Sequence, residues 1–255
     1  MSEADHYRRE KDSYRWRTLQ SVNALLFVAP MLVAFHVGSA VIDAPLAAQD
    51  NLGLFATRDL ERILGVFGST APYLPPLLVG AALLVQHAAR RDRWRLDATV
   101  FVGMVVESVI WALPLLALNY LCGRLLNTGG SILAAGGSPQ LVNVLKALGA
   151  GVYEEFVFRL VGLGLLTWII VNVFSVRKRR DWVVLFAIVA SSLAFSLYHF
   201  SAGGRAMTPE FNAGDFTWRA AAGLCLALAY VTRGFGVAVG AHVVWDLYVI
   251  LIAGA

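Results

Sequence analysis

Charge is scarce in this sequence. Only 15% of its 255 residues are Asp, Glu, Lys or Arg, against about 25% in a typical soluble domain. Hydrophobic residues make up 58%, and the mean hydropathy is +0.65. The composition excludes an ordinary soluble domain and predicts an integral membrane protein built as one all-α helix bundle.

Other features are also missing. The only cysteines, Cys122 and Cys225, lie far apart in or near apolar segments and form no metal-type pair, so we expect inert thiols. The polar start has no short apolar core, so we expect no cleavable signal peptide. The net charge of +4 comes from residues at the ends of apolar segments, and nucleic-acid binding is not expected.

What the chain does contain is long apolar runs. A span across about 30 Å of hydrocarbon needs close to 20 residues. Seven segments qualify, at residues 19–42, 71–89, 98–121, 141–174, 182–200, 216–232 and 235–253. The fourth is too long for one simple span, so it is either a tilted helix or a helix broken near residues 159–164, where Gly162 and Gly164 would tolerate a bend.

Arginine and lysine gather in alternate connections. They precede the first span, follow the second and the fourth, and occupy the turn after the sixth. Since cytoplasmic loops carry the excess of these residues, we expect a cytoplasmic N-terminus and an external C-terminus. Residues 1–17 are then a cytoplasmic polar tail, and residues 18–255 form the membrane domain.

Three connections carry further patterns. Residues 51–68 predict an amphipathic interfacial helix, which either only connects two spans or also guides a membrane-borne substrate. Residues 127–139 predict a loop, with Ser138 and Pro139 placed to start the fourth helix. Residues 201–215 contain Gly203 and Gly204 and form either a mobile lid or a plain exterior loop.

Three charged side chains interrupt the fourth span. A charge at bilayer depth costs about 2.5–3.5 kcal/mol, so Glu154, Glu155 and Arg159 require partners, water or a chemical task. Residues four apart share a helix face, so Glu155 is expected to pair with Arg159, whereas Glu154 points about 100° away. This predicts a structural acid at Glu155 and a general base at Glu154.

Two of the five histidines lie in apolar segments beside a second characteristic residue. His199 follows Phe195 by four residues in the fifth span, and His242 precedes Asp246 by four in the seventh. Ionisable groups in three spans are costly unless they share a polar cavity, which predicts one common site. Its members are Glu154, Glu155, Arg159, His199, His242 and Asp246. The other histidines, His6, His36 and His87, are expected to be interfacial or simply hydrogen-bonded.

These motifs match a known pattern. Glu-Glu-x-x-x-Arg, Phe-x-x-x-His and His-x-x-x-Asn/Asp, each in a different membrane helix, resemble the CPBP family of glutamic intramembrane proteases. That family includes the CAAX prenyl endopeptidases and bacteriocin-processing or immunity proteins of the Abi type. The resemblance covers residues 141–255, which would carry the catalytic core.

The resemblance implies peptide hydrolysis within the bilayer. Glu154, assisted by His199, would activate a water, while His242 and Asp246 would stabilise the oxyanion and Glu155 and Arg159 would hold the site in shape. The implied substrate is a membrane-anchored protein or peptide, and the expected location is a bacterial inner membrane. Prenylation of that substrate stays open.

Asp246 is the Asp variant of the third motif, at a position where the family also has asparagine. An ionised carboxylate cannot donate to an oxyanion, whereas an amide can. Asp246 is therefore either protonated in the site or acts on His242, fixing its tautomer and favouring its charged form.

Zinc chemistry is the rival to metal-free catalysis, because Glu and His are zinc ligands. The sequence has no His-Glu-x-x-His helix, and Arg159 would compete with a cation for Glu155. We therefore expect no cofactor. Two alternative functions stay open on the same residues: a non-catalytic scaffold or immunity protein, and a proton-coupled transporter.

Glu107 is an acid in the third span that the motifs do not include. It lies near Ser108 and Trp111. Either it forms a hydrogen bond to another helix, or it contacts substrate or lipid.

Overall fold

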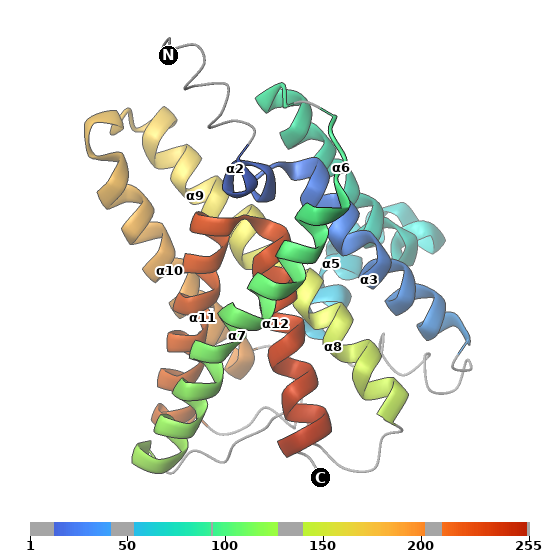
Figure 1. The fold of residues 1–255 in the computed structure, drawn as a ribbon, viewed down its shortest axis with the longest axis vertical. Helices are drawn as coiled ribbons and strands as arrows, with labels where there is room; N and C mark the ends of the chain where they lie inside the picture. Colours follow the sequence, from blue (N-terminus) through green and yellow to red (C-terminus); the bar gives the residue numbers. More distant parts are fainter. Residues whose placement is uncertain (1–12, 42–53, 93, 127–139, 202–210, 254–255) are drawn as a thin grey trace.

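The chain folds as a bundle of helices. The computed structural model describes residues 13–41, 54–92, 94–126, 140–201 and 211–253, and these form helices and no strand. Figure 1 shows the helices packed side by side, with α2 near one end of the bundle and the last turns of α12 at the opposite end. The predicted all-α membrane bundle is confirmed.

Four of the described helices are long and apolar enough to cross a membrane. They are α3 (Ser21–Val41), α7 (Ala98–Leu126), the long helix that begins with α8 (Gln140–Glu155), and α10 (Arg180–Ser201). Helices α6 (Leu74–Arg90), α11 (Ala213–Arg233) and α12 (Phe235–Tyr248) match the other predicted spans, but these are shorter or less apolar. A count of seven spans therefore stays a prediction.

The fourth predicted span is one continuous helix. After α8 the chain continues as a π-helix over Phe156–Leu163, then α9 (Gly164–Trp168), then a second π-helix over Ile169–Val173. Gly162 and Gly164 do not break it. Its 34 residues correspond to about 50 Å at 1.5 Å per residue, which exceeds about 30 Å of hydrocarbon, so a helix of this length either tilts or extends beyond the hydrocarbon. Its π-helical turns begin directly after Glu155.

The basic connections gather at one end of the bundle (Figure 1, top). The short helix α2 (Tyr14–Thr18) lies there, and Arg17 forms a 2.8 Å ion pair with Asp97 in the connection before α7. Arg90, at the end of α6, donates to the carbonyl of Leu19 at 3.1 Å. This gathering is what the alternation of basic connections predicts, and the orientation of that end toward the cytoplasm stays a prediction.

The turn between α11 and α12 joins the same end. Gly234 has a φ of 92°, and a Cβ atom there would lie 2.7 Å from the carbonyl oxygen of Thr18. Only glycine combines this backbone conformation with so close an approach. The turn thereby packs closely against the end of α2.

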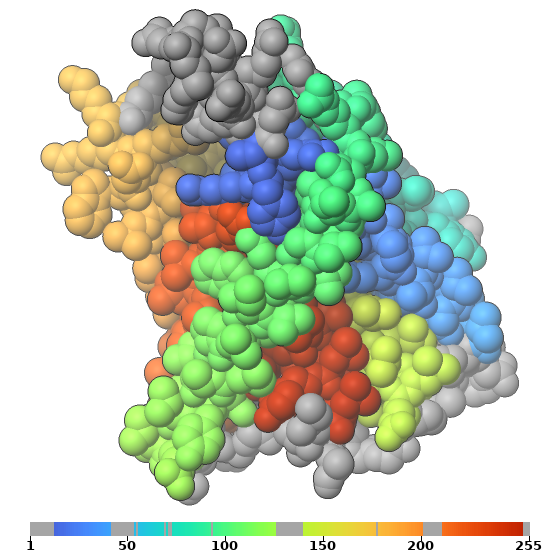
Figure 2. All heavy atoms as spheres, viewed as in Figure 1, coloured from blue at the N-terminus to red at the C-terminus, as the bar shows by residue number. Residues whose placement is uncertain are grey.

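Glycines let α12 and its neighbours approach closely. A Cβ at Gly151 of α8 would meet the Val243 side chain and lie 3.3 Å from the Val243 nitrogen. A Cβ at Gly223 of α11 would lie 3.2 Å from the Cα of Ser192 in α10. Small residues at such crossings allow close backbone packing in membranes. Figure 2 shows α7 lying diagonally over α11 and α12, which encloses this packed region from one side.

The predicted amphipathic helix is shorter than its pattern. Helix α5 covers Phe55–Ile63, and a 3₁₀ segment follows over Leu64–Tyr73. Asp59 of α5 accepts a 2.6 Å hydrogen bond from the hydroxyl of Tyr198 in α10, so this connection packs against the bundle. Residues 127–139, including Ser138 and Pro139, and most of residues 201–215 lie outside the described part of the chain.

Glu107 of α7 bonds to another helix, which is one of the two interpretations that the sequence left open. The Arg233 Nε atom at the end of α11 donates to Glu107 Oε2 at 2.9 Å, and a second guanidinium nitrogen contacts Oε1. Both cysteines, Cys122 and Cys225, are free thiols. None of these residues belongs to the site described below.

The two remaining histidines of the described chain have structural surroundings. His36 of α3 lies 2.5 Å, through Nε2, from the hydroxyl of the buried Tyr153. His87 is buried with its ring edge-on to Trp94, with centroids 4.4 Å apart. His6 lies outside the described residues.

Candidate active site

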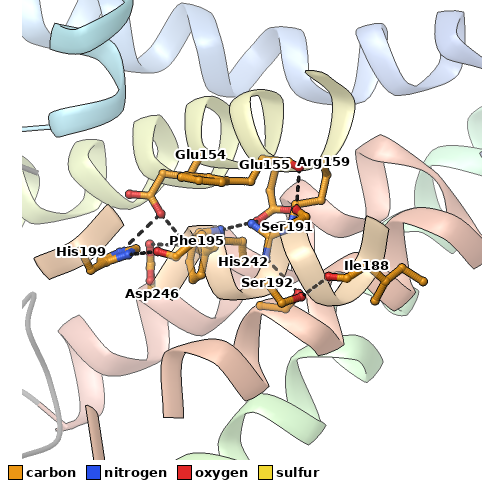
Figure 3. Close-up of polar contacts among 12 residues, drawn as sticks. Glu154, Glu155, Arg159, Ile188, Ser191, Ser192, Phe195, His199, His242 and Asp246 are labelled. Atoms are coloured by element: carbon orange, nitrogen blue, oxygen red, sulfur yellow. Dashed lines mark hydrogen bonds and ion pairs between the residues drawn. The ribbon is translucent and has the colours of Figure 1, made fainter. Parts of the chain in front are cut away.

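The six predicted site residues come together between three helices (Figure 3). Glu154 and Glu155 are the last residues of α8, and Arg159 follows within the π-helix. His199 lies in the last turn of α10, and His242 and Asp246 lie one turn apart in α12. The described part of the chain thus places two carboxylates, an arginine, two histidines and a further acid around one centre.

Glu155 contacts two other members of this cluster. Its Oε1 atom accepts a 2.9 Å hydrogen bond from His242 Nδ1 and forms a 2.9 Å ion pair with Arg159 Nη1. Glu155 and Arg159 have no exposed surface. The predicted pairing of Glu155 with Arg159 is confirmed, and the contact with His242 is an addition that the sequence did not indicate.

Arg159 joins α8 to two further helices. Its Nη2 donates to the carbonyl of Gly223 in α11 at 3.1 Å, and its guanidinium carbon lies 4.5 Å from the centroid of the Phe195 ring in α10. A cation over an aromatic face is attracted to it, more strongly when both are removed from water. Arg159 is therefore a buried tie between the helices that carry the site.

His199 presents one ring nitrogen to Glu154. Its Nδ1 lies 2.8 Å from the carbonyl oxygen of Phe195, and because a carbonyl only accepts, Nδ1 carries the proton. Its Nε2 then faces Glu154 Oε2 at 3.7 Å. The Glu154 side chain retains 13% exposure and has no arginine partner among the residues that the structure describes, so its carboxylate is the accessible acid of the pair.

His242 lies between all three acids. Because an ionised carboxylate only accepts, the bond to Glu155 places a proton on Nδ1 and directs Nε2 into the site. Nε2 lies 3.6 Å from Asp246 Oδ2 and 3.9 Å from Glu154 Oε2. The hydrogen bond that orients this ring therefore comes from Glu155, and Asp246 faces the other nitrogen.

Sequence reasoning missed two contributors. Phe195 was noted only as a motif letter, yet its ring lies edge-on to His199, with centroids 4.7 Å apart, besides supporting Arg159. Arg219 of α11 was passed over, although it is a charge within an apolar segment and its side chain is buried. The cost of a charge in an apolar helix was the signal that could have found it.

A metal ion would have to use the same acids and histidines. In the part of the chain that is described, no group of three or more His, Cys, Asp or Glu side chains is arranged to hold one. Glu155 is engaged by Arg159 and His242, which leaves Glu154, His199 and His242 as the side chains that face one another.

These features define a multi-pass membrane protein with a buried acid and histidine cluster between its helices. A family model described as type II CAAX prenyl endopeptidase Rce1-like matches residues 136–248, which include every residue of the cluster. Residues 136–248 are therefore similar to this family, and the predicted resemblance to the CPBP and CAAX protease family is confirmed. No curated protein and no solved structure matches it.

Proposed function

We propose that this protein is a glutamic intramembrane endopeptidase that cleaves a membrane-anchored protein or peptide. The observation that carries the proposal is the approach of Glu154 and His199, from different helices, to 3.7 Å. A water placed about 2.8 Å from both atoms would bridge them. An acid and a histidine that share one water form a general base suited to hydrolysis.

The proposed reaction uses Glu154 as the base. Glu154 takes a proton from the water, whose oxygen bonds to the scissile carbonyl carbon while the C=O electron pair moves onto the oxygen. Protonated His242 donates its Nε2–H to this oxyanion, since its Nδ1–H is engaged by Glu155. The intermediate then collapses, the C–N bond breaks, and the proton held by Glu154 passes to the leaving amine.

A search for accumulated precursor tests this function. Membrane proteins from cells that carry the wild type or Glu154→Gln would be compared by mass spectrometry. A protease predicts at least one membrane-anchored protein that is shortened only in the wild type. Identical peptide ends in both strains would contradict the proposal and favour a scaffold. The shortened protein also provides the substrate for the assays below.

Asp246 is proposed to stabilise the charged form of His242 from 3.6 Å. We expect Asp246→Asn to cleave the substrate within about tenfold of the wild-type rate, because the amide keeps a polar partner beside Nε2 and can donate to the oxyanion. Asp246→Leu should lose roughly 100- to 1,000-fold in kcat, the usual effect of losing one oxyanion donor, because His242 would no longer be held in the charged form that donates to the oxyanion. Single-turnover cleavage measures both rates, and an equal loss in the two variants would show that the carboxylate itself is required.

The proposed chemistry needs no metal, because the base, the water and the oxyanion donor are all supplied by protein groups. Cleavage by purified protein is expected to continue unchanged after incubation with EDTA or 1,10-phenanthroline followed by desalting. Metal analysis of the same active sample is the companion measurement. One stoichiometric zinc, together with loss of activity on its removal and recovery on its return, would replace this mechanism by a metal-dependent one.

A further inference from the structure

Arg219 is a buried cation that the proposed mechanism does not use. It lies in the second turn of α11, and only 5% of its surface is exposed. Its guanidinium carbon lies 4.9 Å from the centroid of the Phe200 ring, which follows His199 in α10. The side chain is thus placed on the α10 side of α11, beside the residue next to a proposed catalytic histidine.

Arg219 differs from the other arginines in the bundle interior. Arg159 and Arg233 each have a carboxylate within ion-pairing distance, Glu155 and Glu107 respectively. Among the described residues, Arg219 has none within 4.0 Å, and its Nε and Nη1 have no hydrogen-bond partner. Asp215, one turn earlier in α11, acts on it only as a more distant charge. A buried charge without an ion-pair partner lowers the stability of the folded protein unless a ligand supplies that partner.

Arg219 lies close to the proposed catalytic groups. Its ring partner Phe200 directly follows His199, which faces Glu154 across the site at 3.7 Å. The neighbouring turn of α11 also touches the cluster, because the carbonyl of Gly223 accepts from Arg159. A ligand group bound by Arg219 would therefore lie beside the reacting centre.

We propose that Arg219 binds a carboxylate of the peptide substrate and so selects which peptides are cut. This inference rests on the proposed peptidase function. A guanidinium presents paired N–H donors that match a carboxylate, and such bonds are strongest where water is excluded. Peptides offer this group in two places, the free C-terminus and the side chains of Asp and Glu. Arg219 is a specificity residue in either case.

Binding measurements on an inactive protein test the assignment. The protein with Glu154→Gln, in detergent micelles, would be titrated with three probes by microscale thermophoresis. These are dodecanoyl-Ala-Val-Ala-Leu as the free acid, the same peptide as its amide, and the amide with Glu in place of Leu. We expect the free acid or the Glu peptide to bind at least tenfold more tightly than the plain amide, consistent with a charge-assisted hydrogen bond.

Adding Arg219→Gln should remove this preference, and adding Arg62→Gln, on the exposed side of α5, should leave it unchanged. Preference for the free acid identifies the C-terminus as the source, and preference for the Glu peptide identifies a side chain. Equal affinity for all three probes, or a preference that survives Arg219→Gln, would overturn the assignment.

Stability provides a readout that needs no ligand. Arg219→Met should keep or raise the melting temperature of the free protein, because no protein group loses an ion-pair partner. Arg159→Met, the matched control, should lower it, because Glu155 loses its arginine. A fall for Arg219→Met as large as that of the control would show that Arg219 is structural and would overturn the inference.

The two proposals fail in different ways. Cleavage that depends on Glu154 but is indifferent to a substrate carboxylate and to Arg219→Gln would overturn the role of Arg219 alone. Carboxylate-dependent binding that requires Arg219, in a wild-type protein that hydrolyses no peptide, would overturn the hydrolysis alone.

Discussion

Replacing Glu154 by glutamine is expected to lower kcat for cleavage of the recovered substrate by roughly 100- to 10,000-fold, the usual contribution of a general base. The amide fills the same space but cannot accept a proton from water at neutral pH. KM should change little, because Glu154 lies 3.7 Å from His199 and acts on the water between them. Single-turnover cleavage by purified protein in detergent or vesicles measures this loss.

Asp181→Asn is the matched control for this change. It also converts a carboxylate to an amide, but it lies in the first turn of α10, at the opposite end of that helix from His199. We expect wild-type cleavage from it. The melting temperature of Glu154→Gln should equal or exceed that of the wild type, since a partly buried acid is removed. A residual rate within tenfold of the wild type, in folded protein, would assign the base to another residue.

The sequence predicted which six ionisable residues lie together, although it did not indicate the contributions of Phe195 and Arg219. Spacing of four residues along a helix placed Arg159 beside Glu155, and the cost of charge in apolar segments indicated that His199 and His242 belong with them. Helix α8, which carries Glu155, begins at Gln140, and α10, which carries His199, begins at Arg180. Each start lies within two residues of the start of the predicted span. Local periodicity and composition determine these features, so one sequence can reveal them.

Contacts between helices were not predictable in the same way. His242 donates to Glu155 across 87 positions of sequence, and Arg233 reaches Glu107 across 126. Such contacts depend on how helices cross, which glycines such as Gly151 permit but do not specify. For the same reason the sequence could offer fixing the His242 tautomer only as one of two roles for Asp246, whereas in the structure His242 Nδ1 donates to Glu155 and Asp246 faces Nε2.

Arg159→Met is expected to destabilise the protein more than any other single change in the site. Removing one partner of a buried ion pair costs about 3–5 kcal/mol, because the remaining charge stays buried. Glu155 would keep only His242, and the Gly223 carbonyl would lose its donor. For a chain of this size the melting temperature should fall by about 6–20 °C. Thermal unfolding in detergent, followed by tryptophan fluorescence, measures the shift.

The double variant Glu155→Leu, Arg159→Met separates stability from catalysis. Replacing both members of a buried pair by apolar residues is often neutral, so the melting temperature should return toward that of the wild type. Cleavage should nevertheless be strongly reduced in the double variant, because His242 has lost the carboxylate that orients its ring. A double variant whose loss of stability equals the sum of the two single losses would show that Glu155 and Arg159 act independently. Recovery of stability without activity would instead identify the pair as a brace that positions His242.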